Sequence, residues 1–302
     1  MSTLRRTLLA AASLSALILF ARPGAAVAPM PAVFLNHFFV VISQESYAAI
    51  LTDPYLTTTF APFEKRTTAR NDQTYTGAYW YGRKTYFEVF EPPAQGPLGT
   101  SGVAFSVDGV GESAAVKAAW TESLGAAETS PVTRRTETAE AAWFHITAAR
   151  GFGSGLRLWL MEYHKDFLAS WYPQLTPARG TTRAEALDRY VAKIGRSGDR
   201  EAAVLRDVTR LTLALDETSR DRLRSHVFPV GWRMSRSSGG EPPVVFTGPD
   251  GIVLEVVKAT DARHGIIEAR FSVQGAPRPH AATLGQVRLE VEPTSARMRF
   301  AP

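Results

Sequence analysis

Two side chains in the first third of the chain have the chemistry of a reactive or metal-binding pair. His37 lies in the apolar run 34–42, and Glu88 lies in the aromatic run 85–91. Both runs are typical of buried strands, because they are rich in β-branched and aromatic residues. Successive side chains of a strand point to opposite faces, so each of the two has one defined face. If these faces coincide, an imidazole and a carboxylate lie together in an aromatic wall.

Tyrosines are frequent in and just before the second run, and they suggest a ligand pocket. Its candidate lining residues are Tyr75, Tyr79, Tyr81 and Tyr86. Pockets for small molecules are mostly apolar with a few polar groups, which tyrosines provide. The alternative is a hairpin whose aromatic face only packs on the sheet. The histidine and the carboxylate also have ordinary interpretations: a hydrogen bond to a backbone carbonyl, and pairing with a neighbouring Lys or Arg.

The composition narrows the classes of function. The chain has 302 residues, of which 45% are hydrophobic and 21% charged, as in ordinary globular proteins. The formal charge of +5 becomes +2 without Arg5, Arg6 and Arg22, the only charged residues among the first 28. A nearly neutral remainder gives no reason to expect a nucleic-acid partner. The absence of cysteine excludes disulfides, thiol nucleophiles and thiolate metal sites.

The first 28 residues have the pattern of an export signal. Two arginines precede an apolar run, 7–20, that is too short to span a bilayer comfortably. Ala26 and Ala28 offer two positions for cleavage. We therefore expect a periplasmic or secreted protein without a stable membrane span after cleavage. The alternative is an uncleaved membrane anchor.

The order strand, helix, strands occurs three times, in segments 33–91, 102–163 and 208–258. Such an internal repeat constrains the fold more than any single motif. Segment 55–68 is predicted as a connection, and two further strands are predicted after residue 264. The expected organisation is a signal peptide (1–28), two paired modules (29–163), a helical connector (164–206) and a third module with C-terminal strands (207–302).

Three sequence patterns resemble the vicinal-oxygen-chelate superfamily, which includes glyoxalases, bleomycin-resistance proteins and extradiol dioxygenases. Asn36-His-Phe-Phe-Val-Val-Ile42 resembles the first strand of a module, and Gly102-Val-Ala-Phe-Ser-Val-Asp108 resembles the same strand of the next. Phe246-Thr-Gly-Pro-Asp-Gly-Ile-Val-Leu-Glu255 resembles the final turn and strand. The resemblance covers most of the chain apart from 164–206 and about the last 35 residues, and it suggests an exported bacterial branch.

The resemblance implies an α+β fold in which repeated βαβββ modules form a half-barrel sheet with a concave cleft. It also implies metal ligands on the first and last strands of each module: His37 and Glu88 from the first, and Glu162 from the second. The chain departs from the pattern at Gly102 and Arg210, where the further histidines would stand. One imidazole and two carboxylates form a facial triad that suits iron, manganese or zinc.

Three functions from different classes follow from this resemblance. The first is a metal-dependent lyase, isomerase or dioxygenase acting on a small molecule. The second is a non-catalytic binder of a small ligand, as bleomycin-resistance proteins are, and the missing second histidine favours it. The third is a structural or partner-binding role for a degenerate repeat.

Overall fold

The computed structural model describes residues 29–71, 73–135, 140–149, 156–168, 180–196, 199–236, 243–275 and 277–301. Residues 1–28, which carry the expected export signal, lie outside this part of the chain. Within the described part, none of the helices combines the length and the apolar character needed to cross a membrane.

The first repeat is a βαβββ module. Its elements are β1 (Phe34–Val41), α1 (Gln44–Thr52), a π-helical turn (Tyr55–Phe60), β2 (Phe63–Arg70), β3 (Gln73–Tyr81) and β4 (Tyr86–Phe90). The Ser43 side chain accepts the backbone N–H of Ser46 and so begins α1. Segment 55–68 is not only a connection, because the π-helical turn and most of β2 lie there.

The second repeat is also a βαβββ module. Its elements are β5 (Ser101–Ser106), α2 (Ser113–Leu124), β6 (Ala127–Arg135), β7 (Glu140–Ala149) and β8 (Leu156–Tyr163). α2 ends at Gly125, which adopts the left-handed conformation (φ 84°) that glycine tolerates best. The two modules form a closed barrel with the strand order β1-β4-β3-β2-β6-β7-β8-β5. One residue pair between β2 and β6, Arg70 and Arg134, completes the ring.

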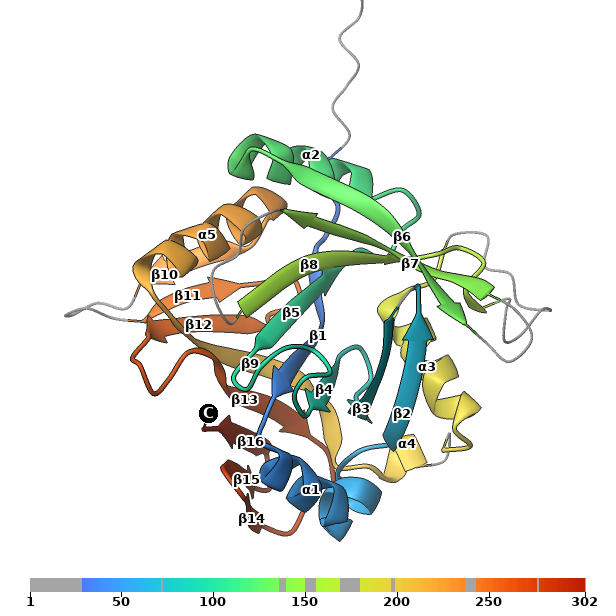
Figure 1. Cartoon of the computed structure of the whole chain (residues 1–302), viewed down its shortest axis with the longest axis vertical. Helices are drawn as coiled ribbons and strands as arrows, with labels where there is room; N and C mark the ends of the chain where they lie inside the picture. The colour runs from blue at the N-terminus through green and yellow to red at the C-terminus, as the bar shows by residue number, and fades with distance from the viewer. Residues whose placement is uncertain are drawn as a thin grey trace, which may run out of the picture.

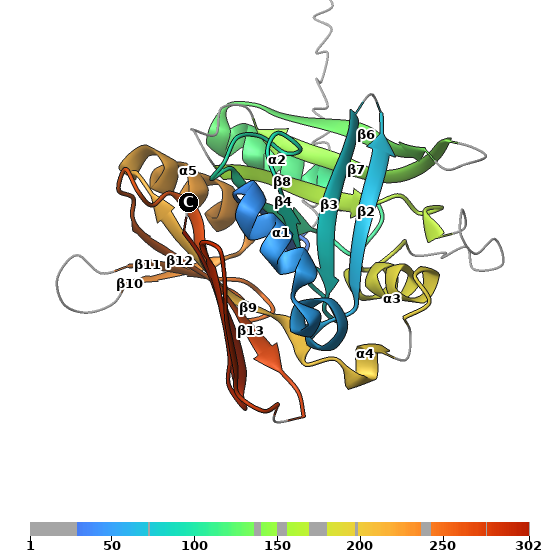
Figure 2. The same ribbon diagram turned by 60° about the horizontal axis from the view of Figure 1, so that its bottom comes forward.

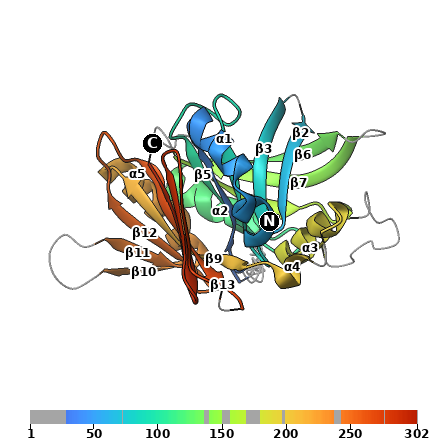
Figure 3. The same cartoon turned by 90° about the horizontal axis from the view of Figure 1, so that it is seen from below.

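The connector contains α3 (Arg183–Lys193) and the short α4 (Asp199–Ala202). Thr182 and Glu185 form the capping box that the sequence predicts at the start of α3. In Figure 3, α3 lies beside the barrel, on the side away from α5 (Glu217–Val227). Its buried side chains join the aromatic residues inside the barrel in one hydrophobic cluster.

The rest of the chain forms a second, open sheet of eight strands. Its third module consists of β9 (Leu205–Leu215), α5, β10 (Arg233–Arg236), β11 (Val244–Thr247) and β12 (Val253–Lys258). The last four strands are β13 (Gly265–Val273), β14 (His280–Leu284), β15 (Val287–Val291) and β16 (Ser295–Phe300). The strand order is β10-β11-β12-β9-β13-β16-β15-β14. The sequence predicted only two strands in this tail, so β14 and β16 are additional findings.

The last four strands differ from a complete module in one respect. Only residues 274–279 connect β13 to β14, whereas a parallel crossover needs about a dozen residues. β16 therefore lies antiparallel to β13, whereas β4 and β12 lie parallel to β1 and β9. Among the described residues of this connection there is no helix, and the returning strand β16 runs in the opposite direction.

Two hydrophobic cores hold these parts in place. The larger core lies between the outer face of the barrel and one face of the second sheet, where Phe87 contacts Phe271 and Phe105 contacts Trp232. The smaller core fills the inside of the barrel. Figures 1 and 2 show the second sheet beside the barrel. The mixed α+β fold with paired βαβββ modules confirms the predicted fold class, and the first pair closes into a complete barrel.

Candidate functional site in the barrel

The structure brings His37 and Glu88 together inside the barrel. They lie on the parallel neighbours β1 and β4, where Phe39 pairs with Glu88 and His37 pairs with Tyr86. Paired residues in adjacent strands share a face, so the sequence argument about strand faces holds here. The His37 Nε2 and Glu88 Oε1 atoms are 3.9 Å apart, which is too far for a direct hydrogen bond.

The His37 ring is held on several sides. It stacks on Tyr86 with ring centroids 4.4 Å apart and meets the edge of Trp159 at 5.4 Å. Its Nδ1 lies 2.8 Å from the Asn36 Oδ1. The register with β5 shifts between Leu35 and His37, and Asn36 lies at this irregularity. The imidazole therefore has a fixed orientation with Nε2 directed toward Glu88.

Burial sets the charge of both groups. It lowers the pKa of His37 to about 3, with a smaller contribution from the positive charge of Arg70. It raises the pKa of Glu88 to about 7, although Arg66 and Arg70 oppose this shift. At neutral pH the imidazole is uncharged and the carboxyl group is close to half-protonated. Because the imidazole is uncharged, the two groups do not form an ion pair.

Both residues line a cleft of about 150 Å³ inside the barrel. The aromatic walls of the cleft are formed by Phe39, Tyr75, Tyr86, Trp143, Phe144 and Trp159. Two guanidinium groups, those of Arg70 and Arg157, add positive charge. The cleft thus combines flat apolar walls with a few polar groups, as small-molecule sites do.

Arg70 is a cleft residue that the sequence reasoning missed. It ends β2, and its guanidinium lies 5.5 Å from the centre of the Tyr75 ring. Among the residues that the structure describes, its side chain forms no hydrogen bond and no ion pair within 4.0 Å. Its positive charge acts on Glu88 across the cleft without a direct contact between the two groups. Arg70 could have been identified from the sequence if residues 63–70 had been predicted as a strand.

Glu162 does not join His37 and Glu88. Met161 lines the cleft, so Glu162, the next residue of β8, points to the other face. Its carboxylate accepts the backbone N–H groups of Gly111 (2.7 Å) and Ser113 (2.9 Å), at the start of α2. The negative charge is stabilised there by the N-terminal end of a helix. Glu162 therefore has a structural role that the strand pattern alone did not indicate.

The pairing of the two modules shows what replaces the missing ligands. Gly102 lies opposite Phe39, and His37 lies opposite Ala104, so Gly102 is the counterpart of His37. A Cβ atom on Gly102 would lie 2.3 Å from the Phe39 ring and 2.7 Å from Trp159. Trp159 pairs with Ala104 and is the counterpart of Glu88. Aromatic rings fill the space that two further ligands would need.

A metal site of the expected type does not fit these side chains. Among the described residues, no group of three or more His, Asp and Glu side chains lies close enough to hold an ion. His37 and Glu88 alone supply two donors, and the rings of Phe39 and Trp159 occupy the opposite side. The expected triad with Glu162, and with it an iron, manganese or zinc centre, is not assembled.

Only part of the predicted tyrosine pocket lines the cleft. Tyr75 and Tyr86 do, whereas Tyr79 and Tyr81 lie deeper in the barrel core. The Arg66 guanidinium lies 4.1 Å from the centre of the Tyr79 ring and donates to the Tyr81 hydroxyl. That hydroxyl donates to Glu64 (2.7 Å). This polar network fills the barrel beside the cleft.

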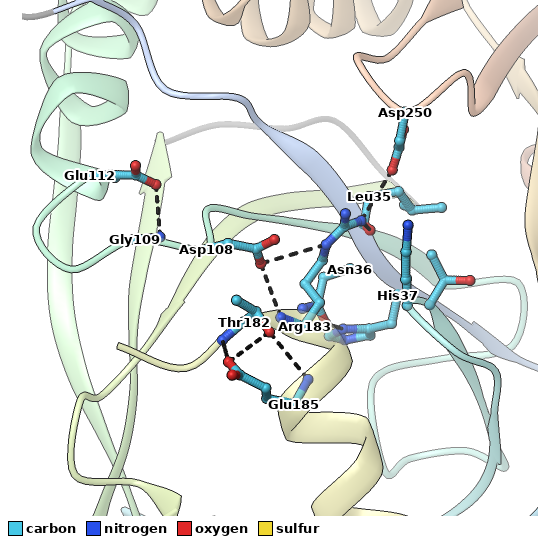
Figure 4. A network of polar contacts seen from close by, with 12 residues as sticks. Leu35, Asn36, His37, Asp108, Gly109, Glu112, Thr182, Arg183, Glu185 and Asp250 are labelled. Atoms are coloured by element: carbon cyan, nitrogen blue, oxygen red, sulfur yellow. Dashed lines mark hydrogen bonds and ion pairs between the residues drawn. The ribbon is translucent and has the colours of Figure 1, made fainter. Parts of the chain in front are cut away.

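Behind β1, a buried arginine connects the barrel, the connector and the second sheet. The Arg183 guanidinium donates to the Leu35 carbonyl (2.7 Å) and to Asp250 (3.1 Å), and its backbone N–H donates to Asp108 (3.0 Å). Figure 4 shows Arg183 between these residues, with Asn36 and His37 nearby. Arg183 therefore fixes the end of β1 that leads into the cleft.

Solved structures with a similar chain path are mostly dioxygenases. The 2,3-dioxygenase LapB from Pseudomonas sp. KL28 is 13% identical over 90% of this chain and 95% of its own, with a TM-score of 0.46. The 2,2',3-trihydroxybiphenyl 1,2-dioxygenase from Sphingomonas wittichii strain RW1 is 9% identical over 86% of both chains, with a TM-score of 0.42. The chain spans 35% of a xylose isomerase-like TIM barrel/4-hydroxyphenylpyruvate dioxygenase fusion protein, at 15% identity and a TM-score of 0.42. At this similarity they say nothing about the activity of this chain.

Comparison of the sequences themselves gives the family. No curated protein matches the sequence. A family model matches residues 35–300, which include both modules of the barrel and the whole second sheet. The chain therefore belongs to the family of unknown function DUF5829.

Proposed function

We propose that the barrel cleft binds a small planar organic anion, about the size of one ring, without a metal ion. The observation that carries this proposal is the Arg70 guanidinium, which lines an aromatic cleft without forming an ion pair to any described residue. An anionic group of a ligand would supply the missing partner. This corresponds to the second of the functions expected from the sequence, a small-ligand binder.

The size and walls of the cleft support a flat ligand. Its volume of about 150 Å³ is similar to that of an engineered apolar cavity that accommodates benzene. Trp159 and Tyr86 offer ring faces and edges on which a planar molecule can stack. Glu88 and His37 lie at the same cleft and provide a hydrogen-bond donor and acceptor for a second polar group.

The state of Glu88 makes the proposed affinity depend on pH. A bound anion favours the protonated carboxyl group, because two negative charges in a buried site repel each other. We therefore expect tighter binding below the Glu88 pKa of about 7 than above it. Glu88→Gln should remove most of this dependence while leaving Arg70 in place.

A metal-dependent lyase, isomerase or dioxygenase is not part of this proposal. His37 and Glu88 supply two donors, and Glu162 is engaged at the start of α2. A purely structural role is less well supported, because the Arg70 guanidinium lines the cleft without a direct ion pair to any described residue.

The test is a titration of the protein with three probes that differ in charge: benzoate, phenol and benzylamine. Benzoate should bind more tightly than the other two, and Arg70→Gln should weaken benzoate binding by about tenfold or more, as expected for loss of a charged hydrogen bond. Arg224→Gln, which removes an exposed arginine of α5, is the matched control.

Equal affinities for the three probes would contradict the proposal, as would unchanged benzoate binding in Arg70→Gln. Zinc, manganese and ferrous iron are added in separate titrations. If benzoate binding requires one of these ions, the proposal that the cleft binds its ligand without a metal ion is contradicted.

We also propose, from residues 1–28 alone, that the protein acts in the periplasm or outside the cell. The measurement is the N-terminal sequence of the protein recovered from each cell fraction. A mature chain beginning at Val27 or Pro29 in the periplasm or medium is expected. An intact N-terminus in the cytoplasm would contradict it.

A further inference from the structure

The second sheet has one face in the larger core and one face directed away from the barrel. Leu211, Ala269 and Met298 belong to the core. The residues adjacent to them in β9, β13 and β16 point the other way. This outer face carries five arginines, which we call the arginine face: Arg210, Arg270, Arg288, Arg297 and Arg299.

The arginines form rows across neighbouring strands. Arg210 lies directly opposite Arg270, and Arg270 lies directly opposite Arg297. Arg288 and Arg299 form a further pair. Like charges at directly opposite positions destabilise a sheet. Arg299 also lies opposite Glu268, and Arg297 lies opposite Glu290, so the row of Arg210, Arg270 and Arg297 ends at a glutamate.

Glutamates on the same face hold the guanidinium groups in place. Glu268 accepts Arg270 Nε (2.7 Å) and Arg299 Nε (3.2 Å). Glu290 accepts Arg299 (3.2 Å) and Arg297. Each guanidinium has five N–H donors, and most of these remain free of any described partner. The groups are thus oriented, and their remaining donors face solvent.

We propose that the arginine face binds an acidic polysaccharide, whose chain runs across β9, β13 and β16. Adjacent strands are about 4.8 Å apart, so the central row presents one guanidinium group at each such step. Planar guanidinium groups match carboxylate groups in geometry as well as in charge. A chain with a carboxylate on each unit complements such a row.

The composition of the face disfavours other polyanions. Its strands present no aromatic ring outside the core on which unpaired bases would stack. A broad sheet does not enter the major groove, which admits a helix or a two-stranded ribbon. The exposed large apolar side chains of the described chain are Met30, Leu98, Val110 and Phe228, and none lies on this face to insert into a membrane.

The test uses polygalacturonate oligomers as the probe, with neutral dextran as the uncharged control. Binding to the full-length mature protein is measured over a series of NaCl concentrations. The double variant Arg270→Gln/Arg297→Gln should bind at least tenfold more weakly at low salt. Its dependence of affinity on salt should be flatter by roughly one unit of slope for each guanidinium–carboxylate pair that the variant removes. The control Arg220→Gln/Arg224→Gln removes the same charge from α5.

A second measurement keeps the proposal falsifiable. The variant relieves opposition between like charges but also removes the partly exposed ion pairs of Arg270 with Glu268 and of Arg297 with Glu290, so its thermal midpoint should change little. Marked destabilisation would mean that the arginines serve the fold, and would overturn the proposal. So would equal weakening in the α5 control, or tighter binding to duplex DNA or anionic vesicles than to polygalacturonate. Binding of benzoate in the barrel cleft is independent of all these outcomes.

Discussion

The barrel and the open sheet each have a basic residue and a glutamate at equivalent positions. The two pairs differ in burial and in whether they form an ion pair. In the barrel, Glu88 pairs with Phe39, two residues after His37. In the open sheet, Glu255 pairs with Thr212, two residues after Arg210. His37 and Glu88 are 3.9 Å apart and mostly buried, whereas Arg210 and Glu255 form an ion pair at 3.2 Å on a partly exposed surface.

Closure of the sheet is the cause of this difference. Inside the barrel, water is displaced, so the charged forms of the imidazole and the carboxyl group are disfavoured. On the open sheet, solvent reaches both side chains and a permanent guanidinium charge is tolerated. Equivalent positions of the first and third modules thus hold an uncharged imidazole beside a buried carboxyl group in the barrel and an ion pair in the open sheet.

The largest effect on the free energy of unfolding should come from Arg183, whose side chain connects the barrel with the second sheet. Arg183→Ala leaves the buried Leu35 carbonyl and Asp250 without this donor. Loss of one partner of a buried ion pair lowers the free energy of unfolding by about 3–5 kcal/mol. Urea unfolding is the measurement. Arg220→Ala, which removes an exposed ion pair with Glu217, should change it by less than about 1 kcal/mol; similar losses in both would refute the buried role.

The pH dependence of stability should report the burial of Glu88 inside the barrel. The folded-state pKa of Glu88 is raised to about 7, so its contribution is fully present below pH 4.5 and is lost as pH rises through 7. The free energy of unfolding of wild type relative to Glu88→Gln should therefore fall by roughly 3 kcal/mol across this range. The His37 contribution is common to both proteins and cancels.

The measurement is urea unfolding of both proteins at several pH values between 4.5 and 8. A constant difference between wild type and Glu88→Gln would mean that the barrel does not perturb Glu88.

A smaller loss of stability should come from enlarging Gly102, which lies against two aromatic rings beside the cleft. Gly102→Ala places a Cβ atom against the Phe39 and Trp159 rings, and such overpacking destabilises by about 1–3 kcal/mol. Glu268 is the equivalent residue of the open sheet, because it pairs with Thr212. Glu268→Ala should change the free energy of unfolding by less than about 1 kcal/mol. Equal effects, measured by thermal unfolding, would argue against the closed packing of the barrel.

The smallest effect on the free energy of unfolding should come from Glu162, which belongs neither to the barrel pair nor to the pair in the open sheet. Glu162→Gln weakens two hydrogen bonds at the start of α2, so we expect a loss of about 1 kcal/mol. Benzoate affinity and the response to added divalent metal should stay as in wild type. A change in metal affinity, measured by calorimetry, would mean that Glu162 is a metal ligand after all.

The sequence by itself determined the modules and one half of the site. Alternation along two apolar runs was enough to place His37 and Glu88 on defined faces, because the period of a strand is strict. The capping box at Thr182–Glu185, which the sequence predicts, is a local signal of the same kind. Local rules suffice where the interacting groups are close in sequence.

Only the tertiary structure decided what surrounds that pair. The two missed tail strands have short runs with a weak pattern, and the π-helical turn depends on its packing. Arg70 and Trp159 reach the cleft from β2 and β8, and Glu162 turns toward α2, because the barrel closes. Burial, and with it the opposite pKa shifts of His37 and Glu88, depends on all eight strands. Desolvation is set by distant parts of the chain, and no local pattern contains it.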